Sequence, residues 1–193
     1  RMVGENGRAQ QLGLARGPVR EALLELGKVK IVEIFPQRGS YVSLVDYALV
    51  DQACFMRETL ECAVVERCCA AGLGPEQVAS LRENVKLQRF YLENGQKDRL
   101  MGLDHEYHQL LFAAAGVPEV HTLMHSMMIH FDRVRAMSLA AVRDIKIVEE
   151  HGAIAEALAA GEATAAKQLM HRHVTRYQVD KEAISRQYPQ YIR

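Results

Sequence analysis

From residue 47 onward the sequence shows helical periodicity almost without interruption, and this feature constrains the fold more than any other. Apolar residues recur at helical spacing in six segments, namely 47–71, 75–95, 97–115, 118–137, 144–160 and 162–187. Gly and Pro mark the short connections, as in Gly72-Leu73-Gly74-Pro75 and Gly116-Val117-Pro118. Short connections between long amphipathic helices favour antiparallel neighbours. The sequence therefore predicts an all-helical bundle of six to seven helices.

The first 45 residues follow a different order of elements. A short helical pattern covers 5–12, and Gly17-Pro18 opens a second helix, with Pro in the first turn where its missing N–H costs little. Two short strands are predicted at 31–35 and 40–44, joined by a turn at 36–39. Helix, tight turn, helix and hairpin is the order of a winged helix-turn-helix.

These two patterns predict a mainly α protein with two domains, 1–45 and 46–193, joined by a short linker at about Leu44 to Tyr47. Net charge is zero overall, but residues 1–45 carry seven Arg and Lys against four Glu, a net charge of +3. This asymmetry favours a polyanion as the partner of the first segment alone, with chance fluctuation as the alternative. Because the first residues already resemble the middle of a motif, we expect a further N-terminal segment.

The four cysteines all fall within one predicted helix, at Cys54, Cys62, Cys68 and Cys69. A disulfide framework would distribute them along the chain, and no CxxC pair is present. We expect core thiols in a reducing compartment, the cytoplasm, with a redox switch as the alternative reading. Since there is no signal peptide and no apolar run near the roughly 18 residues of a membrane span, no membrane partner is expected.

A family resemblance lies in residues 11–23, which read Gln-Leu-Gly-Leu-Ala-Arg-Gly-Pro-Val-Arg-Glu-Ala-Leu. This run resembles the signature of GntR-family transcription regulators, where it spans the turn and the recognition helix. The resemblance implies binding to operator DNA through Arg16, Gly17 and Arg20, with Arg38 at the tip of the wing.

The physical chemistry of these positions agrees with that role. Arg16 and Arg20 are one helical turn apart, so both guanidinium groups project from one face, where they can reach guanine edges or phosphates. Gly17 lets the backbone approach DNA closely, and an Arg at the wing suits a narrow minor groove. The alternative for each Arg is a solvated side chain paired with a nearby Glu.

Three departures from the family pattern affect operator preference and helix packing. Asn6 stands where the family usually has a DNA-contacting Arg, and Arg8 stands where it has a core Leu. The family's Glu-Gly-Leu before the wing is Val29-Lys30-Ile31 here.

In the helical segment, four polar side chains occupy positions of the helical repeat that face the interior, namely Asp104, His108, His151 and His173. Each shares a face with apolar residues: Leu100, Leu111 and Phe112 for the first two, Ile147, Ile154 and Leu158 for the third, and Ala166, Leu169, Met170 and Tyr177 for the last. A buried carboxylate is costly unless it is paired, and a divalent cation would pair it while taking neutral imidazoles as ligands. The alternative is a set of hydrogen-bonded core histidines.

The same residues carry a second resemblance, which covers nearly all of residues 47–180. Asp104-x-x-x-His108, then Glu150-His151, then the run from Gly161 to His173 resemble the FCD effector domain of the FadR subfamily of GntR regulators, whose Asp and three His bind metal. The resemblance implies a divalent metal at these four residues, most simply Zn²⁺, with Ni²⁺ or Mn²⁺ as alternatives.

The other histidines are expected outside this site. His121 and His125 form an i, i+4 pair, but no carboxylate shares their stripe; His171 points about 200° away from His173. His105 and His130 are interpreted as solvated or packed at a helix edge.

Arg57 lies among apolar positions of the first bundle helix, inside a family pattern that reads Met56-Arg-Glu-Thr-Leu-Glu61 here. A buried Arg needs an anion, either Glu61 one turn away or the carboxylate of an effector. Arg133 and Arg135 are further candidates for the same role.

Together these features favour a homodimeric, ligand-responsive regulator, most simply a repressor, whose partners are operator DNA and a small organic acid. Two alternatives stay open: a helical metal-dependent hydrolase that uses the same Asp and His cluster, and a protein-interaction module that has lost DNA binding.

Overall fold

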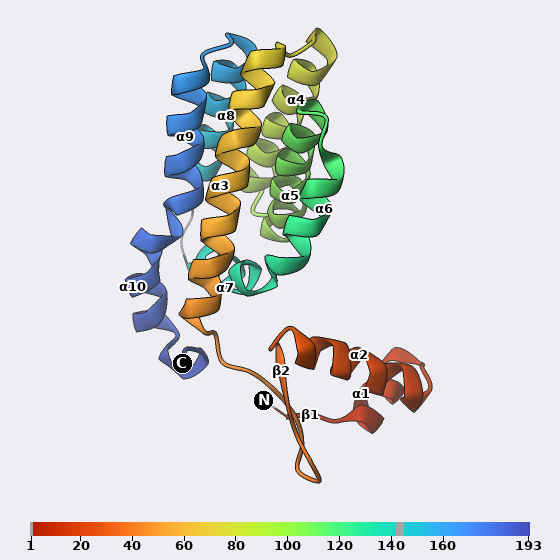
Figure 1. Ribbon diagram of the computed structural model, residues 1–193. Coiled ribbons are helices and arrows are strands. Elements are labelled where there is room, and N and C mark those ends of the chain that lie inside the picture. The colour runs from red at the N-terminus through yellow and green to blue at the C-terminus, as the bar shows by residue number, and fades with distance from the viewer. Residues whose placement is uncertain (1, 142–144) are drawn as a thin grey trace. The chain divides into compact units, whose positions relative to one another are not determined.

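The computed structural model describes residues 2–141 and 145–193, which form two compact units. One unit spans the chain up to Asp46 together with Tyr191–Arg193, and the other spans Tyr47–Gln190. Figure 1 shows their elements, which confirm the predicted mainly α fold with a winged helix-turn-helix followed by a helical bundle.

The first unit combines two helices with a three-stranded antiparallel sheet. Its elements in chain order are β1 (Met2–Val3), α1 (Glu5–Leu12), α2 (Arg16–Lys28), β2 (Val32–Phe35) and β3 (Gly39–Val42). β3 lies between β1 and β2, and its residue Val42 pairs with Val32. The sequence did not predict β1, because two residues are too few to show strand alternation. Ala9, Val19, Leu23 and Val32 form the core of this unit.

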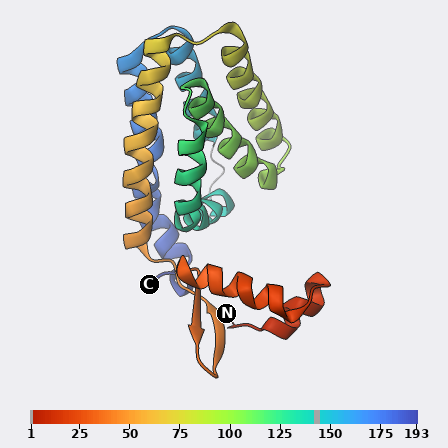
Figure 2. The same cartoon turned by 45° about the vertical axis from the view of Figure 1, so that its right-hand side comes forward.

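The hairpin extends as a narrow ribbon (Figure 2). At its tip Gln37 and Gly39 have left-handed backbone angles, with φ of 62° and 96°. The Phe35 and Tyr41 rings meet edge to face at a centroid distance of 5.7 Å, and the Tyr41 hydroxyl donates to the Arg38 carbonyl at 3.2 Å. These contacts fix the backbone of the tip, while the Arg38 side chain is exposed.

The turn between α2 and β2 also has a left-handed residue, Lys30, with φ of 60°. Lys30 N–H donates to Gly27 O at 3.0 Å and Ile31 N–H donates to Leu26 O at 2.9 Å. This pair of bonds closes α2 with a left-handed residue directly after the C-cap Val29, a position usually taken by Gly. A residue with a Cβ atom loses roughly 1 kcal/mol of folding free energy in this backbone conformation, so the fold keeps Lys30 in a conformation that lysine disfavours.

The predicted linker is tied to the C-terminus of the chain. Val45 N–H donates to Tyr191 O at 2.8 Å, Arg193 N–H donates to Val45 O at 2.9 Å, and Val45 is only 2% exposed. Tyr191 ends the short 3-10 helix η1 (Pro189–Tyr191). Sequence pattern gave no sign of this contact, since isolated bridges have no periodicity.

The second unit contains eight α-helices within the described residues. They are α3 (Tyr47–Ala71), α4 (Pro75–Glu93), α5 (Lys97–Ala114), α6 (Pro118–Met127), α7 (Ile129–Ala141), α8 (Ile145–Ala159), α9 (Ala163–Thr175) and α10 (Tyr177–Gln187). No described helix is long and apolar enough to cross a membrane.

Two predicted helices are each divided in the structure. The segment 118–137 becomes α6 and α7, which meet at Met128, and the segment 162–187 becomes α9 and α10, which meet at Arg176. Neither junction carries Gly or Pro, so the local pattern could not reveal it. The cause lies in packing, because α9 lies against α3 and α8 whereas α10 lies against α7.

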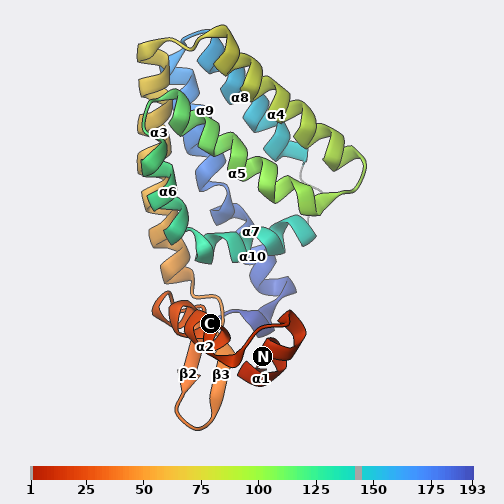
Figure 3. The ribbon, with the colours of Figure 1, turned by 90° about the vertical axis from the view of Figure 1, so that its right-hand side faces the viewer.

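Five helices close into a ring around the interior of this unit. In order around the ring, α3 packs on α9, α9 on α8, α8 on α4, α4 on α5, and α5 on α3. α6 lies against α5 and α3, and α7 runs crosswise to α3 (Figure 3). Side chains from all five ring helices therefore reach a shared interior.

The cysteines behave as core residues of α3. Cys54, Cys62 and Cys68 are buried and Cys69 is partly buried, and all four are free thiols. Burial raises the pKa of the Cys68 thiol to about 11, so this thiol stays protonated and unreactive near neutral pH.

Candidate metal centre

Asp104, His108, His151 and His173 come together inside the ring. The first two lie on α5, His151 on α8 and His173 on α9, and all four are buried. One potential ligand atom from each lies within 4.8 Å of all the others. His173 Nε2 is 3.2 Å from His151 Nε2 and 3.3 Å from His108 Nε2, and Asp104 Oδ1 is 3.5 Å from His151 Nε2.

A chain of hydrogen bonds fixes the tautomer of His151. Asn84 Nδ2 donates to the Leu103 carbonyl at 3.1 Å, so Asn84 Oδ1 is left to accept from Gln88 Nε2 at 2.6 Å. Gln88 Oε1 must then accept from His151 Nδ1, at 2.8 Å. Since a neutral imidazole has one N–H, Nε2 of His151 presents a lone pair to the cluster. Tyr107 stacks on the ring at 4.1 Å and holds its orientation.

Side-chain partners also fix the tautomers of the other two imidazoles, His173 at its Nδ1 and His108 at its Nε2. His173 Nδ1 donates to Glu150 Oε2 at 2.9 Å, and Arg176 binds the other oxygen of Glu150 at 3.2 Å. His108 Nδ1 lies 3.0 Å from Glu61 Oε2, although the pair does not reach hydrogen-bond geometry. Arg57 Nη2 donates to His108 Nε2, which also requires a lone pair on Nε2. All three Nε2 atoms are thus acceptors.

Burial sets the charges of the four groups. It lowers the pKa of His108 and His151 well below the ordinary value and that of His173 to about 3, with the cation of Arg57 adding to the effect on His108 and His173. Burial by itself would raise the pKa of Asp104, but the cations of Arg135 and Arg57 hold it below its usual range. The cluster therefore consists of three neutral imidazoles and one ionised carboxylate.

This donor set fits a divalent cation. The Nε2 lone pair of His173 faces those of His151 at 3.2 Å and His108 at 3.3 Å, and such lone pairs repel unless a cation lies between them. Ligands at about 2.1 Å from a tetrahedral metal lie roughly 3.4 Å apart, close to the separations seen here. The Nδ1 partners Gln88 and Glu150 are outer groups of the kind that orient metal-binding imidazoles.

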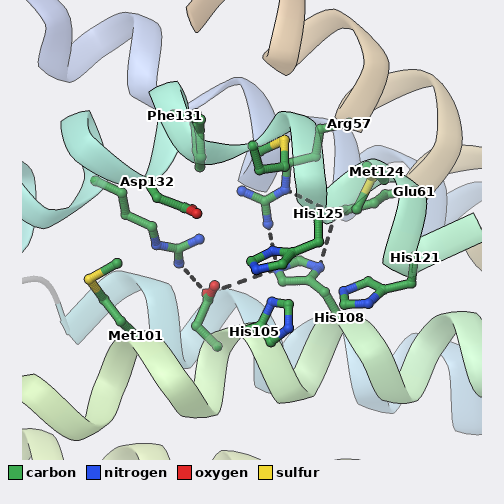
Figure 4. Close-up of a pocket in the computed structure, with 13 residues that line it drawn as sticks. Arg57, Glu61, Met101, His105, His108, His121, Met124, His125, Phe131 and Asp132 are labelled. Carbon is green, nitrogen blue, oxygen red and sulfur yellow. Dashed lines mark hydrogen bonds and ion pairs between the residues drawn. The ribbon is translucent and has the colours of Figure 1, made fainter. Parts of the chain in front are cut away.

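The cluster borders a cavity of about 100 Å³ (Figure 4). Arg57 lines it, donates to Glu61 Oε1 at 2.8 Å, and lies over the Phe131 ring at 5.1 Å. Arg135 also lines it and is paired with Asp104. Of the two alternatives for Arg57, the structure shows the Glu61 pair and also places the guanidinium at the cavity. Arg135, only a secondary candidate from the sequence, lines the cavity, whereas Arg133 does not.

Three histidines expected elsewhere line the same cavity, namely His105, His121 and His125. His105 and His130 were interpreted as solvated or packed at a helix edge, and the structure shows packing. The His105 ring is half-buried against the rings of His121 and His125, and His130 is 8% exposed. His171 is exposed and pairs with Glu58 at 3.0 Å, on the opposite face from His173.

The candidate DNA-contacting residues all lie at the surface of the first unit. Arg16, Gly17, Arg20 and Arg38 are exposed. Arg16 Nε donates to Glu5 Oε2 at 2.7 Å, so its structural partner is on α1 rather than further along its own helix. A Cβ on Gly17 would meet no atom within 4 Å. Asn6 is exposed and Arg8 is half-buried with a hydrogen bond to Gln11 at 2.7 Å.

Comparison with known proteins extends this picture. Residues 52–176 match the FCD domain. The chain is 34% identical over 193 residues to an uncharacterized HTH-type transcriptional regulator in an unstable DNA locus of Streptomyces ambofaciens, covering 97% of this chain and 79% of that protein. It is 33% identical over 165 residues to the HTH-type transcriptional repressor RspR of Escherichia coli K12, covering 85% of this chain and 72% of that protein.

Solved structures agree in fold. E. coli McbR/YncC superposes with a TM-score of 0.79 at 19% identity, over 97% of this chain and 88% of that one. A putative GntR regulator from Rhodococcus sp. RHA1 gives a TM-score of 0.71 at 22% identity, over 93% and 86%. The curated relatives are transcription regulators, so the hydrolase alternative is set aside. The chain belongs to the GntR family of transcription regulators, among those that carry an FCD domain.

Proposed function

We propose that this regulator is a repressor whose operator affinity depends on a small organic acid bound at a metal site in the helical unit. The proposal assigns DNA binding to residues 1–45 and metal and effector binding to residues 46–193. One observation carries it: three imidazole lone pairs and one carboxylate, from three helices, converge inside the helical unit, and two of these residues, Asp104 and His108, line a cavity that also presents two guanidinium groups.

Asp104, His108, His151 and His173 would hold the metal. Nitrogen and oxygen ligands suit Zn²⁺ best, with Ni²⁺ or Mn²⁺ as alternatives. When bound, a divalent cation supplies positive charge at the cluster and a coordination position for oxygen atoms of an acid. The outer partners Gln88 and Glu150 keep the imidazoles in the tautomer that the metal requires.

Arg57 and Arg135 are the groups that would bind the carboxylate of the effector. Both line the cavity next to the cluster, and Arg presents paired N–H donors that match carboxylate geometry. A cavity of about 100 Å³ is well below the roughly 300 to 1,000 Å³ of pockets for drug-sized ligands. The effector is therefore a compact acid of a few carbon atoms.

In the first unit, Arg16 and Arg20 would contact bases or phosphates in the major groove, and Arg38 would contact the minor groove. The N-cap of α2, Ala15, makes no side-chain hydrogen bond, which leaves the first N–H groups of this helix available to a phosphate. Gly17 has no internal packing role, since its Cβ position is open, and this agrees with close approach of DNA to the backbone.

Winged-helix regulators commonly read two half-sites with two-fold symmetry, so we propose a homodimer that acts on operator DNA in the cytoplasm. The repressor role is inferred from the relative RspR, which is a transcriptional repressor. The acid changes operator affinity only if it binds one arrangement of the helices more tightly than another.

A titration of the purified full chain tests the proposal. Operator sequences selected from a random duplex library are bound to zinc-loaded and chelated protein, with a panel of hydroxy- and dicarboxylic acids. We expect one equivalent of zinc and a change in operator affinity of about tenfold or more for at least one acid, only in the zinc-loaded protein. If no zinc is retained the metal site is wrong, and if no acid changes the affinity the ligand response is wrong.

A further inference from the structure

A second group of histidines lines the cavity beside the proposed metal cluster. His105 comes from α5, and His121 and His125 come from α6. The ring of His105 lies 3.9 Å from that of His125 and 4.8 Å from that of His121, measured between centroids. Asp132 of α7 lines the same cavity (Figure 4). None of these four residues belongs to the Asp104 cluster.

His121 is the most informative member of this group. It is only 3% exposed, and none of the residues that the structure describes forms a hydrogen bond with its ring. Its packing partners are the rings of Phe112, His105 and His125. The ring nitrogens of His121 are not among the fully buried atoms without a partner, so they are open to the cavity that this residue lines. A ligand in the cavity can supply the missing partner.

The side chains of this group differ in chemistry from those on the arginine side of the cavity. Among the described residues that line the cavity, guanidinium groups come from Arg57 and Arg135, and both are already paired, with Glu61 and with Asp104. Beside the three imidazoles, the carboxyl group of Asp132 supplies an acceptor. Imidazoles and a carboxyl group can bind hydroxyls, which both donate and accept, whereas a second carboxylate next to Asp132 is unfavourable.

We infer that His105, His121, His125 and Asp132 form a subsite for hydroxyl groups, so that the effector is a hydroxylated monocarboxylic acid and not a dicarboxylic acid. This inference rests on the proposed function, because it assumes that the carboxylate lies at the metal, Arg57 and Arg135. It assigns the distal end of the acid to side chains of α5, α6 and α7.

Calorimetric titration of the zinc-loaded full chain with three acids of equal carbon number tests the subsite. Propanoate has no second polar group, glycerate has two hydroxyls, and malonate has a second carboxylate. We expect glycerate to bind at least about tenfold more tightly than either of the others. The variant His121→Phe keeps a ring of similar size, and it should reduce this preference to less than about threefold. His171→Phe, on the exposed face of α9, should keep the full preference.

A second measurement does not depend on the stability of a variant. Glycerate should shift the imidazole ¹⁵N resonances of His121 in the wild-type chain, and propanoate should not. Malonate binding as tightly as glycerate, or an unchanged preference in His121→Phe, would overturn the subsite while leaving the proposed function intact. A second zinc equivalent that disappears in His121→Phe would also overturn it, because the histidines would then bind metal. Failure of all three acids to bind would contradict the proposed function and the subsite together.

Discussion

The two units place their candidate residues under opposite constraints. In the first unit Arg16, Gly17, Arg20 and Arg38 are exposed, and the fold makes little use of them. In the second unit the cluster residues are buried, and other side chains fix the tautomer of each imidazole. Changes at these exposed residues of the first unit should therefore alter DNA binding without altering stability, whereas changes in the cluster should alter both metal binding and stability.

The largest expected difference between the units is their response to acid. The folded-state pKa values of His108, His151 and His173 lie below the ordinary value of 6.5, so the unfolded chain binds more protons below that pH. After a chelator has removed any metal, the contribution of these histidines to the free energy of unfolding of the helical unit is fully present above about pH 6.5. It falls toward pH 3, by up to about 1.4 kcal/mol per pH unit for each histidine.

Hydrogen exchange of the intact chain, followed by mass spectrometry from pH 7 to pH 4, measures this difference. The sequence up to Asp46 contains no histidine. The hydrogen-exchange protection of α1 and α2 should therefore show no loss caused by histidine protonation. Equal loss of protection in both units would show that the buried imidazoles do not control acid stability.

The next largest effect concerns two neighbouring histidines of α9. His173 is 6% exposed within the cluster, whereas His171 is exposed and pairs with Glu58. His173→Gln should lower zinc affinity by more than about 100-fold, since even outer groups of a metal site are worth 10- to 100-fold. His171→Gln should leave zinc affinity unchanged in a competition titration with a chromophoric chelator. Similar losses in both variants would argue against the site.

A smaller effect is expected on the DNA side. Arg20→Ala should weaken operator binding by about 1 to 3 kcal/mol, as for the loss of one base contact, with stability unchanged within roughly 0.5 kcal/mol. Lys28→Ala is the control on the same helix, since Lys28 is exposed and pairs only locally with Glu25. Fluorescence anisotropy at several salt concentrations measures both variants. An Arg20→Ala variant with wild-type affinity would remove Arg20 from the interface.

The smallest effect tests the one strained position of the first unit that departs from the family pattern. Lys30→Gly should increase stability by about 0.5 to 1 kcal/mol, because Gly adopts the left-handed backbone that Lys30 is forced into. Urea unfolding measures the change, and Lys28→Gly, at the last residue of α2 where the backbone is still helical, should decrease stability. Destabilisation by Lys30→Gly would mean that the lysine side chain stabilises the turn.

The sequence could predict a residue of the site only where the 3.6-residue helical repeat showed that its side chain points toward the interior. Asp104 and His108 are one turn apart on an apolar stripe, and His151 and His173 lie on such stripes too, so their inward direction was visible. Arg135 could not be separated from Arg133 as a candidate, and the His105, His121 and His125 group was not assigned to the cavity, because their position depends on how α6 and α7 pack on α5 and α3. The junctions at Met128 and Arg176 were missed for the same reason, since they carry no Gly or Pro.

By itself, the sequence determined which faces of the helices are apolar, where Gly and Pro end them, and which family motif the first segment carries. These are properties of neighbours along the chain, and the 3.6-residue helical repeat makes them readable. Only the tertiary structure decided which faces meet. The tautomers of His151 and His173, the tie between Val45 and Tyr191, and the second histidine group all depend on contacts between residues distant in sequence, and such contacts leave no periodic signal in the chain.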